Sequence, residues 1–322
     1  MPEISVLIPA YNAEKTIVSA VWSALNQSFK DIEVLVYVDG LTDKTAEIVQ
    51  GINDARVHLF QGKEHCGISY SRNYLLTKTS APYIAWLDAD DILLPGRLSA
   101  QHGFLENHHD VDFLGCWALL RNSDLNTVSM GTNRSFLEAF LLFRNPFVQS
   151  GIMAKNFFSK ENLFFDSAFD YTEDYDLYLR CLEKGKRFAM LPIYGVSYSM
   201  PGEAVWKEKS SVHGLDQKLE QLLLRTHKDC KDDDAGTVLA FIRGNEKIER
   251  PEYVIIKQFI ASARHTIRIK NGQLRRGEKA VLLLYRFRLE RNHRGVVPAF
   301  LWLLLQNPFT VRVLFANRLR VR

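Results

Sequence analysis

Three acidic side chains within four positions form the strongest chemical signal in the sequence. Asp88, Asp90 and Asp91 directly follow an apolar segment that ends in Trp86 and Leu87. Carboxylate oxygens are preferred ligands of Mg²⁺ and Mn²⁺, and such a cation commonly binds one or two carboxylates together with substrate phosphates. The spacing therefore predicts a divalent-cation site that would offset charge on a departing diphosphate. An acidic turn that caps the next helix is the alternative explanation.

A second carboxylate and an arginine occupy comparable positions. Asp39 follows the apolar segment 33–38 and precedes Gly40, so it can accept hydrogen bonds from the base or ribose of a nucleotide. Ordinary turn chemistry explains the same residues. Arg72 follows a glycine turn, and its planar guanidinium suits a phosphate group. A surface arginine on an amphipathic helix is equally consistent with the sequence.

Another acidic group begins a leucine-rich segment at Glu173, Asp174 and Asp176. The helix dipole favours acids at a helix N-terminus, which is a structural explanation for them. Transfer of a group to a hydroxyl with inversion also requires a base on the face opposite the leaving group. We expect Asp174 to be that base, with Glu173 in the same acceptor pocket.

The elements that must position these residues alternate in type along the first hundred residues. Short β-branched runs predict strands at 4–8, 32–38, 57–60 and 83–87. Helical periodicity predicts helices at 13–26, 43–51 and 69–78, the second opened by Thr42 as N-cap. This alternation predicts a parallel sheet covered by helices, which binds ligands beyond the carboxyl ends of its strands.

After Pro95 the pattern becomes mixed. We expect a helix at 96–107, a strand at 113–120 and a helix that begins near Glu173. From about Leu215 the sequence predicts mainly helix. These features complete the prediction of an α/β domain with a helical C-terminal extension.

The C-terminal extension has an unusual charge. The whole chain of 322 residues has a formal net charge of +4, but from Ala261 onward there are 14 basic and 2 acidic residues. Arginines flank the apolar segments 280–289 and 298–305, which predicts attachment to an anionic membrane surface. Packing on the catalytic domain or on a partner subunit is the alternative. No motif indicates nucleic-acid binding.

The sequence gives no sign of export or of a membrane span. The longest apolar stretch, Val296 to Leu305, is shorter than the roughly 20 residues that a bilayer requires. The four cysteines form no disulfide or zinc pattern, and no signal peptide precedes Ile4. We expect a cytoplasmic protein that binds peripherally to the cytoplasmic face of the inner membrane.

Considered together, the motifs resemble those of one enzyme family. They are the segments 4–14 and 24–29, the turn at Asp39, the pair Arg72-Asn73, the acids at 88–91 and the pair Glu173-Asp174. In combination they resemble a family 2 glycosyltransferase over roughly residues 3 to 200. The resemblance implies the GT-A fold, a Rossmann-like and mostly parallel sheet flanked by helices. It also implies inverting transfer from a nucleotide-diphosphate sugar, expected to be a UDP-sugar, to a hydroxyl of a glycan or lipid-linked acceptor.

The resemblance assigns expected roles to individual residues. Pro9, Tyr11 and Glu14 would border the nucleotide, and Asp39 would contact its nucleobase. Arg72 would line the donor pocket, and Asp88 would approach the ribose or the metal. Asp90 would bind Mn²⁺ or Mg²⁺, and Asp174 would be the catalytic base. Two departures accompany this match. Val38 stands where the family has the first acid of a pair, and the segment 198–203 lacks the usual arginine and histidine, so no third metal ligand is indicated.

The predicted organisation is a catalytic domain at 1–213 and a helical region at 214–322. Within the first, residues 1–95 would bind the nucleotide sugar and residues 96–213 the acceptor. A sugar nucleotidyltransferase is a rival, although the segment 9–12 lacks the glycine-rich loop expected of that class. A catalytically inactive, membrane-bound scaffold in polysaccharide assembly is a second rival, and the retention of Asp90 and Asp174 argues against it. The absence of a Q-x-x-R-W motif favours single additions over processive synthesis.

Overall fold

Four parallel strands form the first part of the sheet. They are β1 (Ile4–Ala10), β2 (Ile32–Val38), β3 (Val57–Gln61) and β4 (Tyr83–Trp86), in the spatial order β3-β2-β1-β4. Every residue of β1 is buried, as expected for a central strand that is covered on both faces. The four predicted strands are therefore confirmed, with ends that differ by at most two residues.

The computed structural model describes residues 1–121, 127–132, 134–200, 215–226, 234–243, 254–260 and 285. Two compact units divide the chain. One comprises Met1–Ser129 and Phe147–Lys207, and the other comprises Met130–Pro146 and Glu208–Arg322. The segment 130–146 therefore groups with the C-terminal part of the chain, although it lies within the predicted acceptor half.

Three helices connect the parallel strands, namely α1 (Ile17–Leu25), α2 (Thr45–Gln50) and α3 (Ile68–Lys78). Helix α1 begins four residues later than predicted because Asn12 has a left-handed backbone (φ 49°) and the Ala13 N–H donates to Thr45 Oγ1 (2.9 Å). The prediction that Thr42 caps the second helix is wrong. Asp43 Oδ1 instead accepts from the Thr45 N–H (2.9 Å), and the Thr42 hydroxyl donates to the Asn12 side chain.

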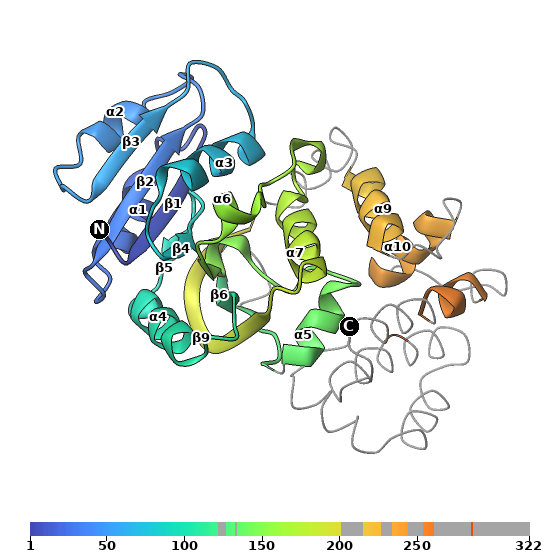
Figure 1. The fold of residues 1–322 in the computed structure, drawn as a ribbon. Helices are drawn as coiled ribbons and strands as arrows, with labels where there is room; N and C mark the ends of the chain where they lie inside the picture. The colour runs from blue at the N-terminus through green and yellow to red at the C-terminus, as the bar shows by residue number, and fades with distance from the viewer. Residues whose placement is uncertain are drawn as a thin grey trace. The chain divides into compact units, whose positions relative to one another are not determined.

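The second part of the sheet is mixed. Strand β8 (Met153–Lys155) lies antiparallel between β4 and β6 (Phe113–Arg121), and β6 pairs in parallel with β9 (Phe188–Ser199). The short strands β5 (Ile92–Leu93) and β7 (Thr127–Val128) pair with β9 and β6 respectively. The long β9 curves strongly, and it is the yellow strand in Figure 1. The predicted α/β class with a mostly parallel sheet and flanking helices is confirmed.

The helices of this part are α4 (Arg97–Asn107), α6 (Phe158–Glu161) and α7 (Glu173–Glu183), accompanied by short 3₁₀ turns at Gln149–Gly151 and Ser167–Phe169. Both α4 and α7 match the predicted helices. Helix α7 carries the predicted base near its first turn, and the turn at 149–151 supports the acidic loop that follows β4.

The second unit contains helices α5 (Arg134–Leu141), α9 (Leu215–Thr226) and α10 (Ala235–Arg243), and residues 254–260 are also helical. Aromatic rings form its core: Phe143 stacks on Tyr285 with centroids 4.2 Å apart and meets Phe259 edge-on at 5.6 Å. The predicted apolar segment 298–305 lies outside the described residues, and so does 280–289 apart from Tyr285. Among the helices that are described, none has the length and apolar character of a membrane span.

Candidate functional site

The acidic loop after β4 is fixed through its backbone. The Asp88 N–H donates to Ser150 Oγ (2.9 Å). The fully buried guanidinium of Arg97 donates to the carbonyl oxygens of Ser150 and Ile152, the latter at 3.0 Å, and so fixes the segment that supports the loop. The loop does not cap the next helix, because Gly96 is the N-cap of α4 and no side chain bonds there. The alternative explanation of these acids as helix caps is therefore wrong.

The three acids of this loop differ in environment. The Asp88 side chain is 26% exposed and the Asp90 side chain is exposed, so a ligand can reach both. Asp91 is buried, and its Oδ1 accepts from the Ser199 N–H at the end of β9 (2.7 Å). Its other oxygen, Oδ2, is buried with no hydrogen-bond partner. Burial, together with the charges of Asp88 and Asp90, raises the pKa of Asp91 to about 8.

These residues suit a divalent cation. Burying a carboxylate oxygen without a partner is costly, and so is gathering like charges in a region of low dielectric. A bound cation relieves both costs, and an all-oxygen donor set is the kind that Mg²⁺ and Mn²⁺ prefer. A cation bound to the two accessible acids would also favour the ionised form of the buried Asp91 carboxyl, which lies beside them in sequence. The donor chemistry of this loop therefore fits the metal expected from the sequence.

Arg72 is buried and connects the acidic loop to α7. Its Nη2 donates to Asp88 Oδ1 (2.9 Å), and its Nη1 donates to Glu173 Oε1. The guanidinium also lies over the ring of Phe165, 5.4 Å from the centroid. Burial alone would lower the pKa of Arg72, but the charges of Asp88 and Glu173 outweigh it and the pKa rises above its ordinary value. The surface alternative is wrong, and here the planar fork binds two carboxylates.

Helix α3 is joined to the segment before α7 by two more side chains. Asn73 Nδ2 donates to the Phe165 carbonyl and its Oδ1 accepts from the Phe165 N–H, both at 2.8 Å. The Ser69 hydroxyl donates to Asp170. Ser69, Arg72 and Asn73 lie three and four residues apart, which places them on one face of the helix. This face therefore fixes the approach of α7 to the acidic loop.

The acids of α7 lie at its N-terminus, as predicted, but their environments differ. Glu173 is 5% exposed, and its Oε2 is buried without a hydrogen-bond partner. Burial raises the pKa of Glu173, while the charge of Arg72 opposes that change. Asp174 is half-buried, and its Oδ1 accepts from the Tyr175 N–H (2.6 Å). The contacts of Arg72 link the predicted metal ligand Asp88 to Glu173, the residue next to the predicted base.

Asp39 lies at the end of β2 and fixes the loop between β3 and α3. Its Oδ1 accepts from the Cys66 N–H and its Oδ2 from the Gly67 N–H, both at 2.8 Å. His65 Nδ1 lies 2.8 Å from the same Oδ2. Gly67 has φ 93°, and an added Cβ would lie 2.9 Å from a carboxylate oxygen of Asp170, so a larger residue would disturb this turn. The carboxylate of Asp39 is buried, and among these partners His65 is the one whose side chain is half-exposed.

The other predicted nucleotide contacts come from the end of β1 and the turn after it. Tyr11 is 45% exposed, and its ring stacks on His65 with centroids 3.9 Å apart. Pro9 is buried in β1, opposite Tyr37 of β2. Glu14 is exposed, and its Oε2 accepts from the Lys44 N–H (3.3 Å). Tyr11 and Asp39 are thus brought together through His65, whereas Glu14 contacts the neighbouring turn.

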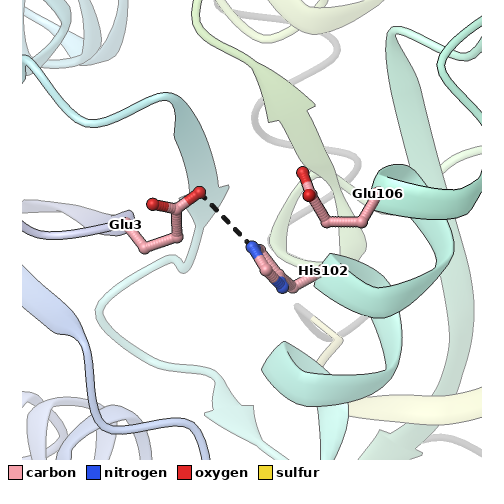
Figure 2. A group of neighbouring side chains, drawn as sticks. All are labelled: Glu3, His102 and Glu106. Atoms are coloured by element: carbon pink, nitrogen blue, oxygen red, sulfur yellow. Dashed lines mark hydrogen bonds and ion pairs between the residues drawn. The ribbon is translucent and has the colours of Figure 1, made fainter.

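Another cluster of titratable groups lies at the amino ends of the strands, opposite the ends that carry the acidic loop. Glu3, His102 and Glu106 place possible ligand atoms within 4.8 Å of one another, as Figure 2 shows. His102 Nε2 lies 3.4 Å from Glu3 Oε1, and Glu106 accepts from the Tyr83 hydroxyl. Glu3 precedes β1 and Tyr83 begins β4, so these contacts join α4 to the amino ends of the strands. The contacts of this cluster are accounted for by the attachment of the helix.

Comparisons with known proteins decide the family. The model of glycosyl transferase family 2 matches residues 5–164. An uncharacterized glycosyltransferase of Haemophilus influenzae is 33% identical over 191 residues, which cover 58% of this chain and 74% of the relative. The chain belongs to glycosyl transferase family 2. A shorter match, 37% identical over 106 residues, covers 33% of this transferase and 42% of the Escherichia coli β-1,3-glucosyltransferase WfaP, named for UDP-Glc and GlcNAc-diphosphoundecaprenol.

Solved structures share the fold of the transferase. S. aureus TarS 1–349 in complex with UDP-GlcNAc has a TM-score of 0.61 at 19% identity, covering 94% of this chain and 92% of that one. The mannosyltransferase PcManGT of Pyrobaculum calidifontis, in complex with GDP-Man and Mn²⁺, has a TM-score of 0.55 at 16% identity, covering 100% and 88%. At these identities the likeness concerns the fold, and it agrees with the predicted GT-A architecture.

Two residues of the site received no role from the sequence. The sequence shows Asp91 as one of three acids within four positions, but its Oδ1 accepts from the Ser199 N–H, more than a hundred residues later. His65 shows no metal-ligand spacing, and its contact with Asp39 arises only when the loop before α3 folds back over β2. The sequence feature that marks this loop is the glycine turn at Gly67, whose N–H donates to Asp39 together with that of Cys66. In the transferase, both residues are placed by long-range packing.

Proposed function

We propose that this glycosyltransferase moves a sugar from a UDP-sugar to a hydroxyl of a glycan or lipid-linked acceptor with inversion. One observation carries the proposal. Arg72 joins Asp88 of the acidic loop to Glu173, the neighbour of Asp174, so that a proposed cation ligand is linked to the helix turn that carries the proposed base. Buried charges of this kind are typical of functional sites.

The donor nucleotide would bind beside Tyr11 and Asp39. The exposed ring of Tyr11 offers a stacking surface for a base, and the carboxylate of Asp39 can accept from the imide N–H of uracil. Cytosine has no proton at the corresponding ring nitrogen, so we expect UDP to bind better than CDP. The names of WfaP and of the TarS complex support uridine as the nucleoside. Pro9 and Glu14 would border this pocket.

Asp88 and Asp90 would hold Mn²⁺ or Mg²⁺, and the bound cation would favour the ionised form of the buried Asp91 beside them. When bound, the cation offsets the charge that develops on the diphosphate as it leaves. The Mn²⁺ in the PcManGT complex supports a metal of this class. Arg72 adds a fixed positive charge at the same place, and its contact with Asp88 limits the positions that this carboxylate can adopt.

Asp174 would accept the proton of the acceptor hydroxyl. As the hydroxyl oxygen bonds to the anomeric carbon, the bond from that carbon to the diphosphate oxygen breaks, and the nucleoside diphosphate departs with the electron pair. The hydroxyl proton passes to the carboxylate of Asp174. Glu173 shares the pocket and holds the first turn of α7 against Arg72. A single displacement of this kind inverts the anomeric configuration.

The proposal also covers the class of acceptor and the location of the protein. In this proposal residues 1–95 bind the donor and residues 96–213 the acceptor, while 214–322 forms a separate helical region. The undecaprenol in the name of WfaP supports a lipid-linked acceptor, and the basic segment from Ala261 supports peripheral attachment to the cytoplasmic face of the inner membrane. Full-length protein should therefore float with anionic vesicles and not with neutral ones.

The experiment that tests the proposal is turnover of UDP-sugars with Mn²⁺. We expect slow hydrolysis of one UDP-sugar, stopped by a chelator and by Asp90→Ala. Glu106→Gln removes a carboxylate from the opposite edge of the sheet and should leave turnover unchanged. Hydrolysis that persists both with chelator and in Asp90→Ala would refute the metal assignment. A panel of UDP-sugars that yields no turnover would refute the choice of nucleotide.

A further inference from the structure

The imidazole of His65 makes the contacts that a nucleobase would make. Its Nδ1 lies 2.8 Å from Asp39 Oδ2, and its ring stacks on Tyr11 with centroids 3.9 Å apart and planes inclined by 24°. The carboxylate can only accept, so Nδ1 carries the proton and donates. Uracil combines the same two properties, a flat ring and an N–H donor. His65 and a uracil would therefore compete for the same partners.

The surroundings allow the imidazole to leave without disturbing Asp39. The N–H groups of Cys66 and Gly67 still hold the two carboxylate oxygens when His65 is absent. The His65 side chain is 50% exposed, so a rotation would carry the ring into solvent. Tyr11 is also partly exposed, and the face of its ring that His65 covers would then be open to a ligand. The acceptor and the stacking surface are thus kept in place while their occupant is exchangeable.

We propose that His65 is a displaceable occupant of the nucleobase pocket, and that the uracil of the donor replaces it on Tyr11 and Asp39. The inference rests on the proposed function, since it takes Asp39 and Tyr11 as base contacts. Ligand affinity falls in proportion to the population of the competent state. His65 thus weakens nucleotide binding.

The test is calorimetric titration of UDP, in the presence of Mn²⁺, into wild-type protein and His65→Ala. If the imidazole occupies the pocket for about nine-tenths of the time, its removal should lower the Kd for UDP about tenfold. His58→Ala is the matched control, because His58 is a half-exposed histidine on β3 whose nearest acid is Glu33 at 3.9 Å. This control should bind UDP as the wild type does.

The outcomes separate the inference from the proposed function. Weaker or unchanged UDP binding by His65→Ala, with normal binding by the wild type, overturns the displacement of His65 and leaves the donor assignment intact. A wild-type protein that binds no UDP refutes the proposed function and the inference together.

A second measurement uses the unaltered protein. In ¹³C-histidine NMR spectra, assigned with the two alanine variants, saturating UDP should shift the resonance of His65 as the ring leaves Tyr11 and Asp39. The resonance of His58 should stay in place. A His65 resonance that does not move on saturation contradicts displacement, whatever the calorimetry gives.

Discussion

The two ends of the strands of one sheet carry similar titratable residues, which differ in burial and hydrogen bonding. At the carboxyl ends of the strands, Asp91 and Glu173 are buried, each has an oxygen without a hydrogen-bond partner, and burial raises the pKa of both. At the amino ends, Glu3, His102 and Glu106 place possible ligand atoms within 4.8 Å of one another (Figure 2), but they are more exposed, and Glu3 and Glu106 each have a neighbouring partner. The tyrosine hydroxyl that bonds Glu106 lowers the pKa of that carboxyl.

The difference shows that proximity of titratable groups does not by itself mark a functional site. At the amino ends of the strands, the titratable side chains pair with neighbouring groups or face solvent, so no ligand is required to stabilise them. The carboxyl edge holds charges that the protein leaves incompletely paired, and such groups are stabilised when a cation or a reacting group arrives.

The largest contrast should appear in catalysis. Asp174→Asn removes the proposed base, and we expect transfer to fall about 1,000-fold while the Kd for UDP stays unchanged. Glu106→Gln should transfer at the wild-type rate. Initial rates with the donor identified by the UDP-sugar panel provide the measurement. Transfer by Asp174→Asn at the parental rate would move the role of base to another residue.

A second contrast concerns stability. Arg72→Met removes the only cation that the described residues place between Asp88 and Glu173, and breaking a buried pair in this way costs about 3 kcal/mol. His102→Gln breaks a partly exposed contact at the other edge and should cost less than about 1 kcal/mol. Urea denaturation measures both variants. Equal losses of unfolding free energy in the two variants would mean that the buried ion pairs of Arg72 stabilise the protein no more than the contact of His102.

The smallest effect should come from an ion pair at the amino end of β3. Hydrogen bonds from Arg56 lower the pKa of Asp54 to about 2. Because the folded-state pKa lies below the ordinary value, the pair stabilises the protein above about pH 4 and that contribution is lost as the pH falls towards 2. Asp54→Asn should therefore cost less than about 1 kcal/mol near neutral pH. The difference from wild type should disappear in urea denaturation at the acidic end, and a difference that grows there would contradict the assignment.

Much of the fold could be predicted from the sequence because its signals are local. The apolar runs of β1 to β4 identify buried parallel strands, and the rule that ligands bind at their carboxyl ends locates Asp39 and the acids at 88–91. The family motifs then indicate the region of the site. Element boundaries were less accurate where side chains override propensity, as at Ala13, whose N–H bonds to Thr45.

The states of the site residues could not be predicted in this way. The position of Arg72 on a polar helix gives no sign of burial, because its partner Glu173 lies about a hundred residues further along the chain. Asp91, unlike Asp90, is buried and accepts from the backbone of Ser199, and His65 becomes relevant only when its loop meets Asp39. Such properties arise from tertiary contacts between distant segments, so a single sequence does not contain a local signal for them.

The central claim is that the acids of the loop after β4, at the carboxyl ends of the strands, form the cation site. Calorimetric titration of Mn²⁺ in the presence of UDP tests it most directly, with Asp91→Asn set against the double variant Glu3→Gln, Glu106→Gln. We predict that the wild type and the double variant bind Mn²⁺ alike, and that Asp91→Asn binds it at least about tenfold more weakly. Binding that survives in Asp91→Asn and disappears in the double variant would place the metal at the opposite edge and contradict the account.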